Sequence, residues 1–430
     1  MNQPPPATLR SSPRSAPTWR TWLAIGATGF GGPAAQIALL HRELVERQRW
    51  LGEDEFLAAM RVCMLLPGPE AQQLATYAGW RLGGWRHGLL AGGLFVLPGA
   101  LLVTALAWLH AAGGDLPLVA AAFAGTRPAV VALVVLAAWR IGRRSITTPS
   151  MAVLALAALA ALAVGAPFPV VMLAAATLGL LAPFPLAPSG GPIAPEAHDP
   201  PAEAGAPRPD ADPRHLLAVI GVAVLLWLSS YAALGWLPLE TPRSRAIATL
   251  FTETTLLSFG GAYAVVPWAL DESVSRGWIE PAERFDALAM GEATPGPLIL
   301  VVTFLGFLSG YRAEPDAAAL KGLTGAGIAT WFAFLPSFAM ILALAPAVGR
   351  VGASPRAGNA LAAVGGVIVA AILLLGLRLA AAAFAPAGHP DPIALLVAIL
   401  AAAALLGGRA TAPFVVALSA AAGTLRMLTA

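Results

Sequence analysis

The chain has 430 residues, of which 58% are hydrophobic and only 11% charged, with a formal net charge of +3. So few charged side chains cannot cover the water-facing surface of a soluble protein of this size, so the composition predicts an integral membrane protein and excludes a soluble enzyme. The basic residues are scattered rather than interleaved with aromatic residues, which argues against a nucleic-acid partner. The single cysteine, Cys63, excludes an intramolecular disulfide.

Apolar runs of about 17 to 25 residues, the length that crosses a bilayer, follow one another along the first part of the chain. Residues 1–16 precede them, carry Arg10 and Arg14, and are expected to form a cytoplasmic N-terminal tail. Residues 17–186 form the first predicted repeat. Its six apolar segments are 17–40, 53–83, 87–111, 117–140, 150–164 and 167–186.

A stretch rich in Pro, Ala and acidic residues, 187–214, is predicted to be a disordered linker because it cannot bury a core. A connecting transmembrane helix is expected at 215–237, and the second predicted repeat spans 246–428. The apolar segments of that repeat are 246–269, 286–310, 318–346, 357–382, 391–407 and 411–428. The total of about 13 transmembrane or re-entrant segments predicts an all-α polytopic membrane protein.

Several landmarks occur twice in the same order, which indicates an internal duplication. A charged loop that contains a Trp separates the first two landmarks in each half. The recurring motifs are Phe30-Gly31-Gly32 with Phe259-Gly260-Gly261, Pro67-Gly68-Pro69 with Pro295-Gly296-Pro297, and Leu97-Pro98 with Leu335-Pro336.

Six crossings in each half, with one more at 215–237, predict that the second half is inverted relative to the first, as in many secondary transporters. Under this topology most arginines of the first half lie on the side of the N-terminus, and only Arg42, Arg47 and Arg49 lie opposite, so the N-terminus is expected in the cytoplasm. If the Pro-Gly-Pro segments alone were re-entrant, the repeats would be parallel. The sequence leaves this alternative open.

Glycines and prolines that break helices at membrane depth indicate a binding site, because a broken helix is tolerated there only beside protein or a wet cavity. The free N–H groups and the positive dipole end of a restarted helix attract anions. Inverted copies would point these helix starts at one another, which suits a small anion. The candidates are Gly31, Gly32, Pro33, Pro67, Gly68, Pro69, Gly260, Gly261, Pro295, Gly296 and Pro297, with kinks or close helix packing as the alternative.

Five charged residues lie inside apolar runs, where an unpaired ion costs at least ~2.5 kcal/mol. Arg61 and Arg127 flank broken segments, and a guanidinium there can bind a tetrahedral oxyanion bidentately. Glu70, Glu253 and Glu292 are candidates for proton coupling, because burial disfavours a charged carboxylate. A structural ion pair or hydrogen bond is the alternative for each of the five.

Polar uncharged residues beside the breaks can donate hydrogen bonds to substrate oxygens, or can instead satisfy the broken backbone. They are Gln36, Gln72, Thr76, Ser258 and Thr294. The histidines show no metal-ligand spacing. The sequence contains neither a nucleotide-binding P-loop nor a nucleophile with a matching base, so no cofactor, metal or enzymatic activity is expected.

The motifs Phe30-Gly31-Gly32-Pro33, Glu43 followed by Trp50, Leu66-Pro67-Gly68-Pro69, Phe259-Gly260-Gly261 and Thr294-Pro295-Gly296-Pro297 together resemble the chromate ion transporter family in its long, two-domain form. The resemblance covers roughly 17–186 and 246–428. It implies a multi-pass protein of the bacterial inner membrane that exports chromate, a divalent tetrahedral oxyanion, with energy from the proton gradient, and so confers chromate resistance. The glycines and prolines of the repeated motifs are the residues to which it extends most directly.

The residues alone support a membrane protein, a duplication and an anion, whereas only the resemblance supplies chromium. A transporter or a channel for sulfate or another small inorganic oxyanion is therefore the alternative. Membrane lipid is the other expected partner. A homodimer is compatible with the sequence, which leaves the oligomeric state open.

Overall fold

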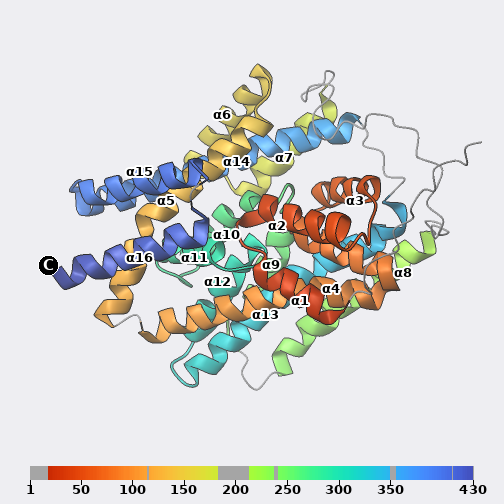
Figure 1. Cartoon of the computed structure of the whole chain (residues 1–430), viewed down its shortest axis with the longest axis horizontal. Coiled ribbons are helices and arrows are strands. Elements are labelled where there is room, and N and C mark those ends of the chain that lie inside the picture. The colour runs from red at the N-terminus through yellow and green to blue at the C-terminus, as the bar shows by residue number, and fades with distance from the viewer. Residues whose placement is uncertain are drawn as a thin grey trace, which may run out of the picture.

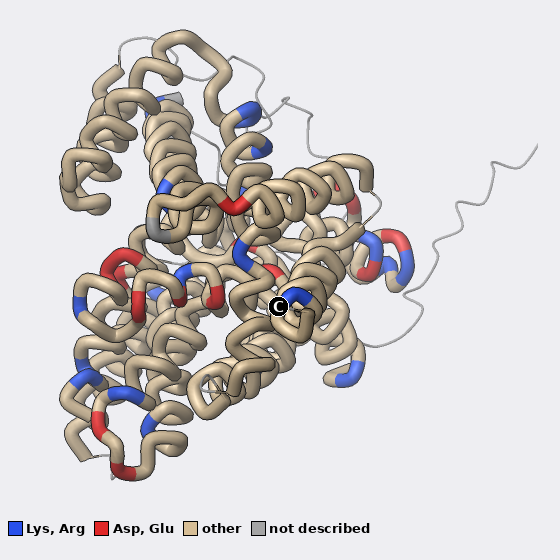
Figure 2. Tube along the Cα trace, turned by 90° about the vertical axis from the view of Figure 1, so that its left-hand side faces the viewer, with Lys and Arg blue, Asp and Glu red and all other residues tan. Residues whose placement is uncertain are grey.

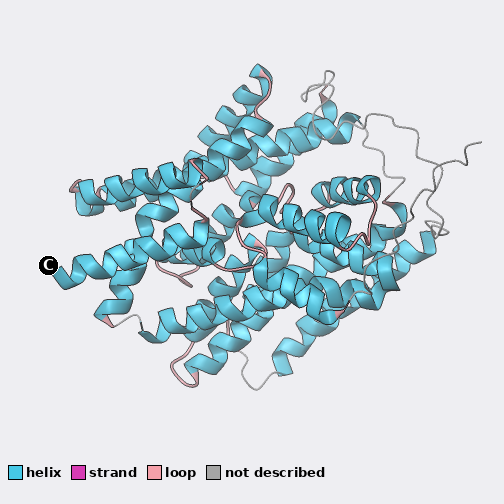
Figure 3. Ribbon diagram, viewed as in Figure 1, coloured by secondary structure: helices cyan, strands magenta, loops and turns pink. Residues whose placement is uncertain are grey.

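The computed structural model describes residues 18–113, 116–182, 213–236, 241–348, 355–408 and 410–429. All regular elements in these ranges are helices, and no strand occurs among them (Figure 1, Figure 3). The prediction of an all-α polytopic membrane protein is therefore confirmed. Six helices are long and apolar enough to cross a membrane, namely Glu70–Gly113, Pro117–Ser145, Pro213–Trp236, Ala318–Ala347, Gly358–Phe384 and Ala412–Thr429. The predicted tail, 1–16, and the linker as far as residue 212 lie outside the described residues.

The first half contains seven α-helices in its described residues. Its elements are α1 (Trp19–Thr28), α2 (Gly32–His41), the π-helical turn η1 (Arg42–Arg47), α3 (Glu53–Leu65), α4 (Glu70–Gly113), α5 (Pro117–Ser145), α6 (Pro149–Ala163) and α7 (Phe168–Leu181). Between the two halves lie α8 (Pro213–Ala233) and the short 3-10 helix η2 (Leu234–Trp236). The described part of α8 has no buried residue and packs against α13, as expected for a helix with most of its surface against lipid.

The second half is divided in a similar way, with short helices first and long apolar helices later. Its elements are α9 (Ser244–Leu256), η3 (Ala262–Ala264), α10 (Val266–Ser275), α11 (Glu283–Ala293), η4 (Leu298–Leu300), α12 (Val301–Tyr311), α13 (Ala318–Leu344), η5 (Ala345–Ala347), α14 (Pro355–Phe384), η6 (Pro386–Gly388), α15 (Pro392–Leu406) and α16 (Ala412–Thr429). Long stretches of the Cα trace carry no charged residue (Figure 2).

Each Pro-Gly-Pro motif is the tip of a helical hairpin, where the chain reverses direction. In the first half, Glu55 on α3 lies twelve residues before Pro67, and its carboxylate Oε1 is 2.6 Å from Nε of Arg81, twelve residues after Pro69. In the second half Glu283, also twelve residues before its Pro-Gly-Pro motif, pairs with Arg312 beyond α12 at 2.6 Å. An arm such as α3, with 13 residues, is about 20 Å long at ~1.5 Å per residue, which is too short to cross a ~30 Å hydrocarbon core.

The chain also doubles back at each Phe-Gly-Gly motif. Trp22 lies eight residues before Phe30, yet its ring centroid is 5.6 Å from that of Trp50, in the loop that follows η1. The same contact occurs in the second half, where the rings of Phe251 and Trp278 are 6.3 Å apart. Each half therefore begins with two helical hairpins. Both 17–40 and 53–83 therefore double back, which differs from the single crossings expected and also from the alternative in which the Pro-Gly-Pro segments alone are re-entrant.

The bases of the two Pro-Gly-Pro hairpins lie at opposite ends of α4. This helix bends at Gly83 and Gly84, where the backbone leaves helical geometry, immediately after Arg81. At the far end of the helix, His110 Nε2 is 2.8 Å from the Glu283 carboxylate at the base of the second hairpin. The segment between Gly84 and His110 rises by about 40 Å, so the two hairpins enter the molecule from opposite ends.

The positions of three arginines follow from these hairpins and differ from the expectation. Arg42, Arg47 and Arg49 were expected opposite the N-terminus, but they lie in the stretch that leads from η1 to Trp50, and Trp50 contacts Trp22 near the start of α1. They therefore lie at the same end of the molecule as the first described residues. The reason is that a glycine break allows a reversal as well as a kink, and the aromatic contacts select the reversal.

Candidate functional site

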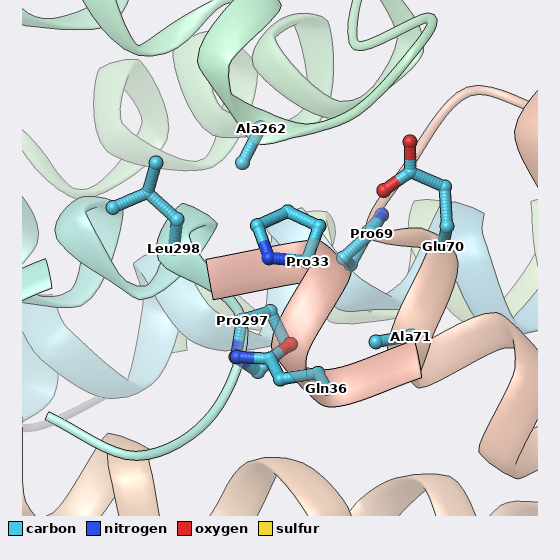
Figure 4. Close-up of a pocket in the computed structure, with 8 residues that line it drawn as sticks. All are labelled: Pro33, Gln36, Pro69, Glu70, Ala71, Ala262, Pro297 and Leu298. Carbon is cyan, nitrogen blue, oxygen red and sulfur yellow. The ribbon is translucent and has the colours of Figure 1, made fainter. Parts of the chain in front are cut away.

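Four helix starts converge on one small pocket between the two halves of the chain (Figure 4). The starts belong to α2, α4, η3 and η4, and each follows one of the glycine or proline breaks. The lining residues are Pro33, Gln36, Pro69, Glu70, Ala71, Ala262, Pro297 and Leu298. The first turn of a helix leaves its N–H groups without an intrahelical partner, so the predicted convergence of helix starts is present in the structure.

The pocket lies where the two repeats meet in a symmetric manner. Pro33 and Ala262 each lie three residues after the Phe of their Phe-Gly-Gly motifs. Pro69 and Pro297 are the last residues of their Pro-Gly-Pro motifs, and Glu70 and Leu298 are the residues that follow. Six lining residues thus form three repeat-related pairs, which is the arrangement expected around a pseudo-twofold axis between the halves.

Two repeat-related hydrogen bonds tie the tip of each Pro-Gly-Pro hairpin to the other half. The N–H of Gly68 donates to the carbonyl of Ser258, immediately before Phe259, at 3.0 Å. The N–H of Gly296 donates to the carbonyl of Gly29, immediately before Phe30, also at 3.0 Å. Each of the four breaks is therefore paired with a break of the opposite repeat, which satisfies backbone groups that lipid could not.

The hairpin tips pack so closely against long helices that a side chain is excluded at key positions. A Cβ on Gly99 of α4 would lie 2.0 Å from the carbonyl oxygen of Pro295. A Cβ on Gly68, whose φ is +117°, would lie 2.7 Å from Oγ of Ser337 on α13. Gly99 and Ser337 follow the repeated Leu-Pro motifs, and both lie within long helices, so each tip packs against a long apolar helix at the same position of the repeat.

Of the five polar uncharged candidates, only Gln36 lines the pocket. Its side-chain Nε2 donates to the carbonyls of Gly296 at 2.6 Å and Gly29 at 3.1 Å, and so joins the two halves. The others are engaged within the protein. Gln72 donates to Thr76 and accepts from Ser337, Ser258 donates to the carbonyl of Gly261, and Thr294 donates to the carbonyl of Met290.

The three acidic candidates lie in different surroundings. Glu70 is buried, with 6% of its surface exposed, and lines the pocket. Glu292 is also buried, and its carboxylate accepts a hydrogen bond from the Tyr263 hydroxyl. Glu253 is exposed on α9, so the argument from burial does not apply to it. Tyr263 was not predicted as a site residue, although its position two residues after Gly261 was a usable signal.

Neither arginine candidate lines the pocket. Arg61 is partly buried on α3. Arg127, on α5, has its guanidinium carbon 5.8 Å from the centroid of the Phe285 ring. Its Nε is buried and has no hydrogen-bond partner within the described part of the chain. The structure thus brings the helix starts together and leaves these two guanidinium groups elsewhere in this conformation.

The amino-acid sequence was compared with models of known protein families and with characterised proteins. A model of the chromate transporter family matches residues 17–180 and 245–424, which include most of both halves. The chain belongs to the chromate transporter family. The transporter is 33% identical over 332 residues to the chromate transport protein of Pseudomonas aeruginosa, an alignment that covers 75% of this chain and 70% of that protein.

Two further relatives align along most of their length. The transporter is 30% identical over 380 residues to the chromate transport protein of Cupriavidus metallidurans, which covers 86% of this chain and 84% of the relative. It is 27% identical over 363 residues to the probable chromate transport protein of Synechococcus elongatus, with 83% of each chain covered. No solved structure matches the chain. The expected family resemblance is thereby confirmed.

Proposed function

We propose that this protein is a secondary transporter that exports chromate across the bacterial inner membrane, in a proton-coupled cycle, and so confers chromate resistance. The observation that carries the proposal is the pocket at which the starts of α2, α4, η3 and η4 meet. The relatives whose names specify chromate transport support the choice of chromate over sulfate, the closest chemical alternative.

Helix starts suit a divalent oxyanion that has lost its water. The α-helices α2 and α4 each offer oriented N–H groups and about half a positive charge at their starts, whereas the three-residue turns η3 and η4 contribute backbone N–H groups only, and these groups are in place before the anion arrives. The repeat-related hydrogen bonds and Gln36 hold the four starts together. A tetrahedral anion has oxygens on all sides, so N–H groups from both repeats can donate hydrogen bonds to it simultaneously.

The tight packing of the two hairpin tips favours a carrier over a channel. The carbonyl of Pro295 against Gly99, and Gly68 against Ser337, leave no room for a side chain between tip and helix. A carrier has to loosen one tip at a time to expose the pocket to one side of the membrane and then to the other. The two repeats, whose hairpins enter from opposite ends, provide one such tip for each side.

Chromate accumulation in intact cells tests the proposal. Cells that express the protein are expected to accumulate less chromate than cells with an empty vector. Ala262→Glu adds a carboxylate to the pocket opposite Glu70 and is expected to abolish the difference. Ala319→Glu, on the exposed surface of α13, is the matched control and is expected to behave like the unaltered protein. Equal accumulation with and without the protein, at comparable expression, would contradict export.

A further inference from the structure

The pocket is symmetric in its backbone but not in its charge. Two of its three repeat-related pairs, Pro33 with Ala262 and Pro69 with Pro297, join residues that carry no charge. In the third pair Glu70 from the first repeat corresponds to Leu298 from the second. The residues that line the pocket therefore include a single ionisable side chain.

The Glu70 carboxyl group is buried and has no cation beside it. The backbone N–H of Glu70 itself donates a hydrogen bond to the carboxylate, no ion pair to it occurs among the described residues, and 6% of its surface is exposed. Its oxygens lie against Gly261, where a Cβ would be 2.9 Å from Oε1 and 3.1 Å from Oε2. A glycine at this position, with φ at +98°, lets the carboxyl group approach the break of the opposite repeat.

The other residues that line the pocket carry no ionisable side chain, and His41, at the end of α2, is held by Glu46 and Glu53 instead. Cys63 and Arg61 lie on α3, and neither lines the pocket. Tyr263 on η3 donates its hydroxyl hydrogen to Glu292, and α2 contributes Gln36, which is uncharged. Proton uptake in the pocket itself therefore has one candidate, the Glu70 carboxyl group.

The charge of Glu70 determines whether an oxyanion fits the pocket. An ionised carboxylate would put a third negative charge beside a dianion at a buried position, whereas a protonated carboxyl group removes that repulsion and can donate its O–H to an anion oxygen. Protonation of Glu70 therefore favours binding of the anion, and binding of the anion favours protonation of Glu70 to the same extent, because such coupling is reciprocal.

We infer that Glu70 takes up one proton together with each oxyanion, so that proton and anion occupy the pocket at the same time and cross the membrane together. This inference rests on the proposed anion transport and specifies its coupling. A dianion that leaves with one proton carries one net negative charge, so the inside-negative membrane potential drives export, whereas a pH gradient that is acidic outside opposes it. The cycle is then a co-transport, not an exchange of anion for proton.

Transport by the purified protein in liposomes, at a fixed membrane potential and over a series of pH values above neutrality, tests the inference. The apparent chromate affinity of the unaltered protein is expected to fall with rising pH more steeply than that of Glu70→Gln, by up to tenfold per pH unit, because one proton is linked to binding. Chromate itself takes up a proton near neutral pH, and the comparison between the two proteins removes that contribution. Glu272→Gln, in a surface pair with Arg276 on α10, should retain the steep dependence.

The charge moved per chromate gives an independent readout. The unaltered protein is expected to move about one charge per anion, and Glu70→Gln about two. If Glu70→Gln does not fold, proton uptake by the unaltered protein replaces it, and addition of chromate to lightly buffered protein at alkaline pH should consume about one proton per anion bound. Equal pH dependence of the two proteins, or no proton uptake on binding, would overturn the inference. Absence of chromate binding by the unaltered protein would instead contradict the proposed function.

Discussion

At the scale of single residues, glycine has two separate functions in this protein. Gly31, Gly68, Gly261 and Gly296 have positive φ and allow the turns at the four breaks. Gly99 lies in a regular part of α4 and needs no unusual φ. A glycine is required there because the carbonyl of Pro295 occupies the place that a Cβ would take. The sequence marks the first group through Gly-Gly and Pro-Gly-Pro motifs, whereas nothing local marks Gly99 as a contact.

Gly99→Ala is expected to push the second hairpin tip away from α4 and to destabilise the protein by about 1 to 3 kcal/mol, as overpacking does in protein cores. Chromate transport should be lost because the pocket is bounded by the same tip. Gly93→Ala is the matched control, because a Cβ on Gly93 meets no atom within 4 Å. Thermal melting and transport in liposomes measure both effects. Equal losses in the two variants would show that the close approach at Gly99 is unimportant.

At the scale of elements, the two Pro-Gly-Pro hairpins are closed by ion pairs at their bases. Glu55 pairs with Arg81 and also accepts a hydrogen bond from the Tyr77 hydroxyl. Glu283 is more deeply buried and receives both guanidinium nitrogens of Arg312, at 2.6 and 2.7 Å, besides Nε2 of His110. The second hairpin is therefore held both to itself and to the far end of α4.

The ion pair between Glu283 and Arg312 makes the free energy of unfolding depend on pH in the acidic range. Burial alone would raise the pKa of Glu283, but hydrogen bonds from His110 and Arg312 outweigh it and lower that pKa to about 2 from an ordinary value of 4.5. A lowered folded-state pKa means that the carboxylate stabilises the fold above the ordinary value and loses this effect as pH falls toward the folded value.

Glu283→Gln is accordingly expected to melt at a lower temperature than the unaltered protein at neutral pH, because it removes the charge that a buried carboxylate shares with the partly exposed Arg312 and with His110, at a cost of about 2 kcal/mol. The difference should shrink as pH falls from 4.5 to about 2. Glu272→Gln, which removes a surface pair with Arg276, should cost at most about 1 kcal/mol. Melting curves in detergent at several pH values measure this. A difference that stays constant with pH would contradict the account.

At the scale of the whole molecule, the fold places two equivalent sets of hairpins at opposite ends of the segment of α4 between Gly84 and His110. Each half contributes two hairpins followed by four helices, and if the hairpins do not cross the membrane, one crossing by α8 is expected to invert the second half. Loops with the same position in the two repeats are then expected on opposite sides of the membrane, with the N-terminal end in the cytoplasm.

Single-cysteine labelling tests this orientation in a variant that lacks the buried Cys63. Glu46→Cys and Ser275→Cys place thiols at exposed positions in the loops that precede the two Pro-Gly-Pro hairpins. A membrane-impermeant reagent is expected to label Ser275→Cys in intact spheroplasts and Glu46→Cys only in inside-out vesicles. Labelling of both from one side would show that the repeats are parallel.

The sequence predicted the duplication, the four breaks and their convergence, because glycine and proline restrict the backbone locally and recur in order. It could not decide between kink and reversal at each break, since that choice depends on contacts such as Trp22 with Trp50. It also could not identify His110 as a partner of Glu283, because the two residues are 173 positions apart. Arg127 was selected for its charge inside an apolar run, a pattern that does not reveal which cavity a side chain faces.

The central claim is that a divalent oxyanion binds where the four helix starts meet. The most direct measurement is a crystal structure of the protein with chromate, in which the anomalous scattering of chromium locates the anion. The account predicts a single strong peak between Pro33, Pro69, Ala262 and Pro297, within hydrogen-bonding distance of first-turn N–H groups. A peak beside Arg61 or Arg127 with none in the pocket would contradict it.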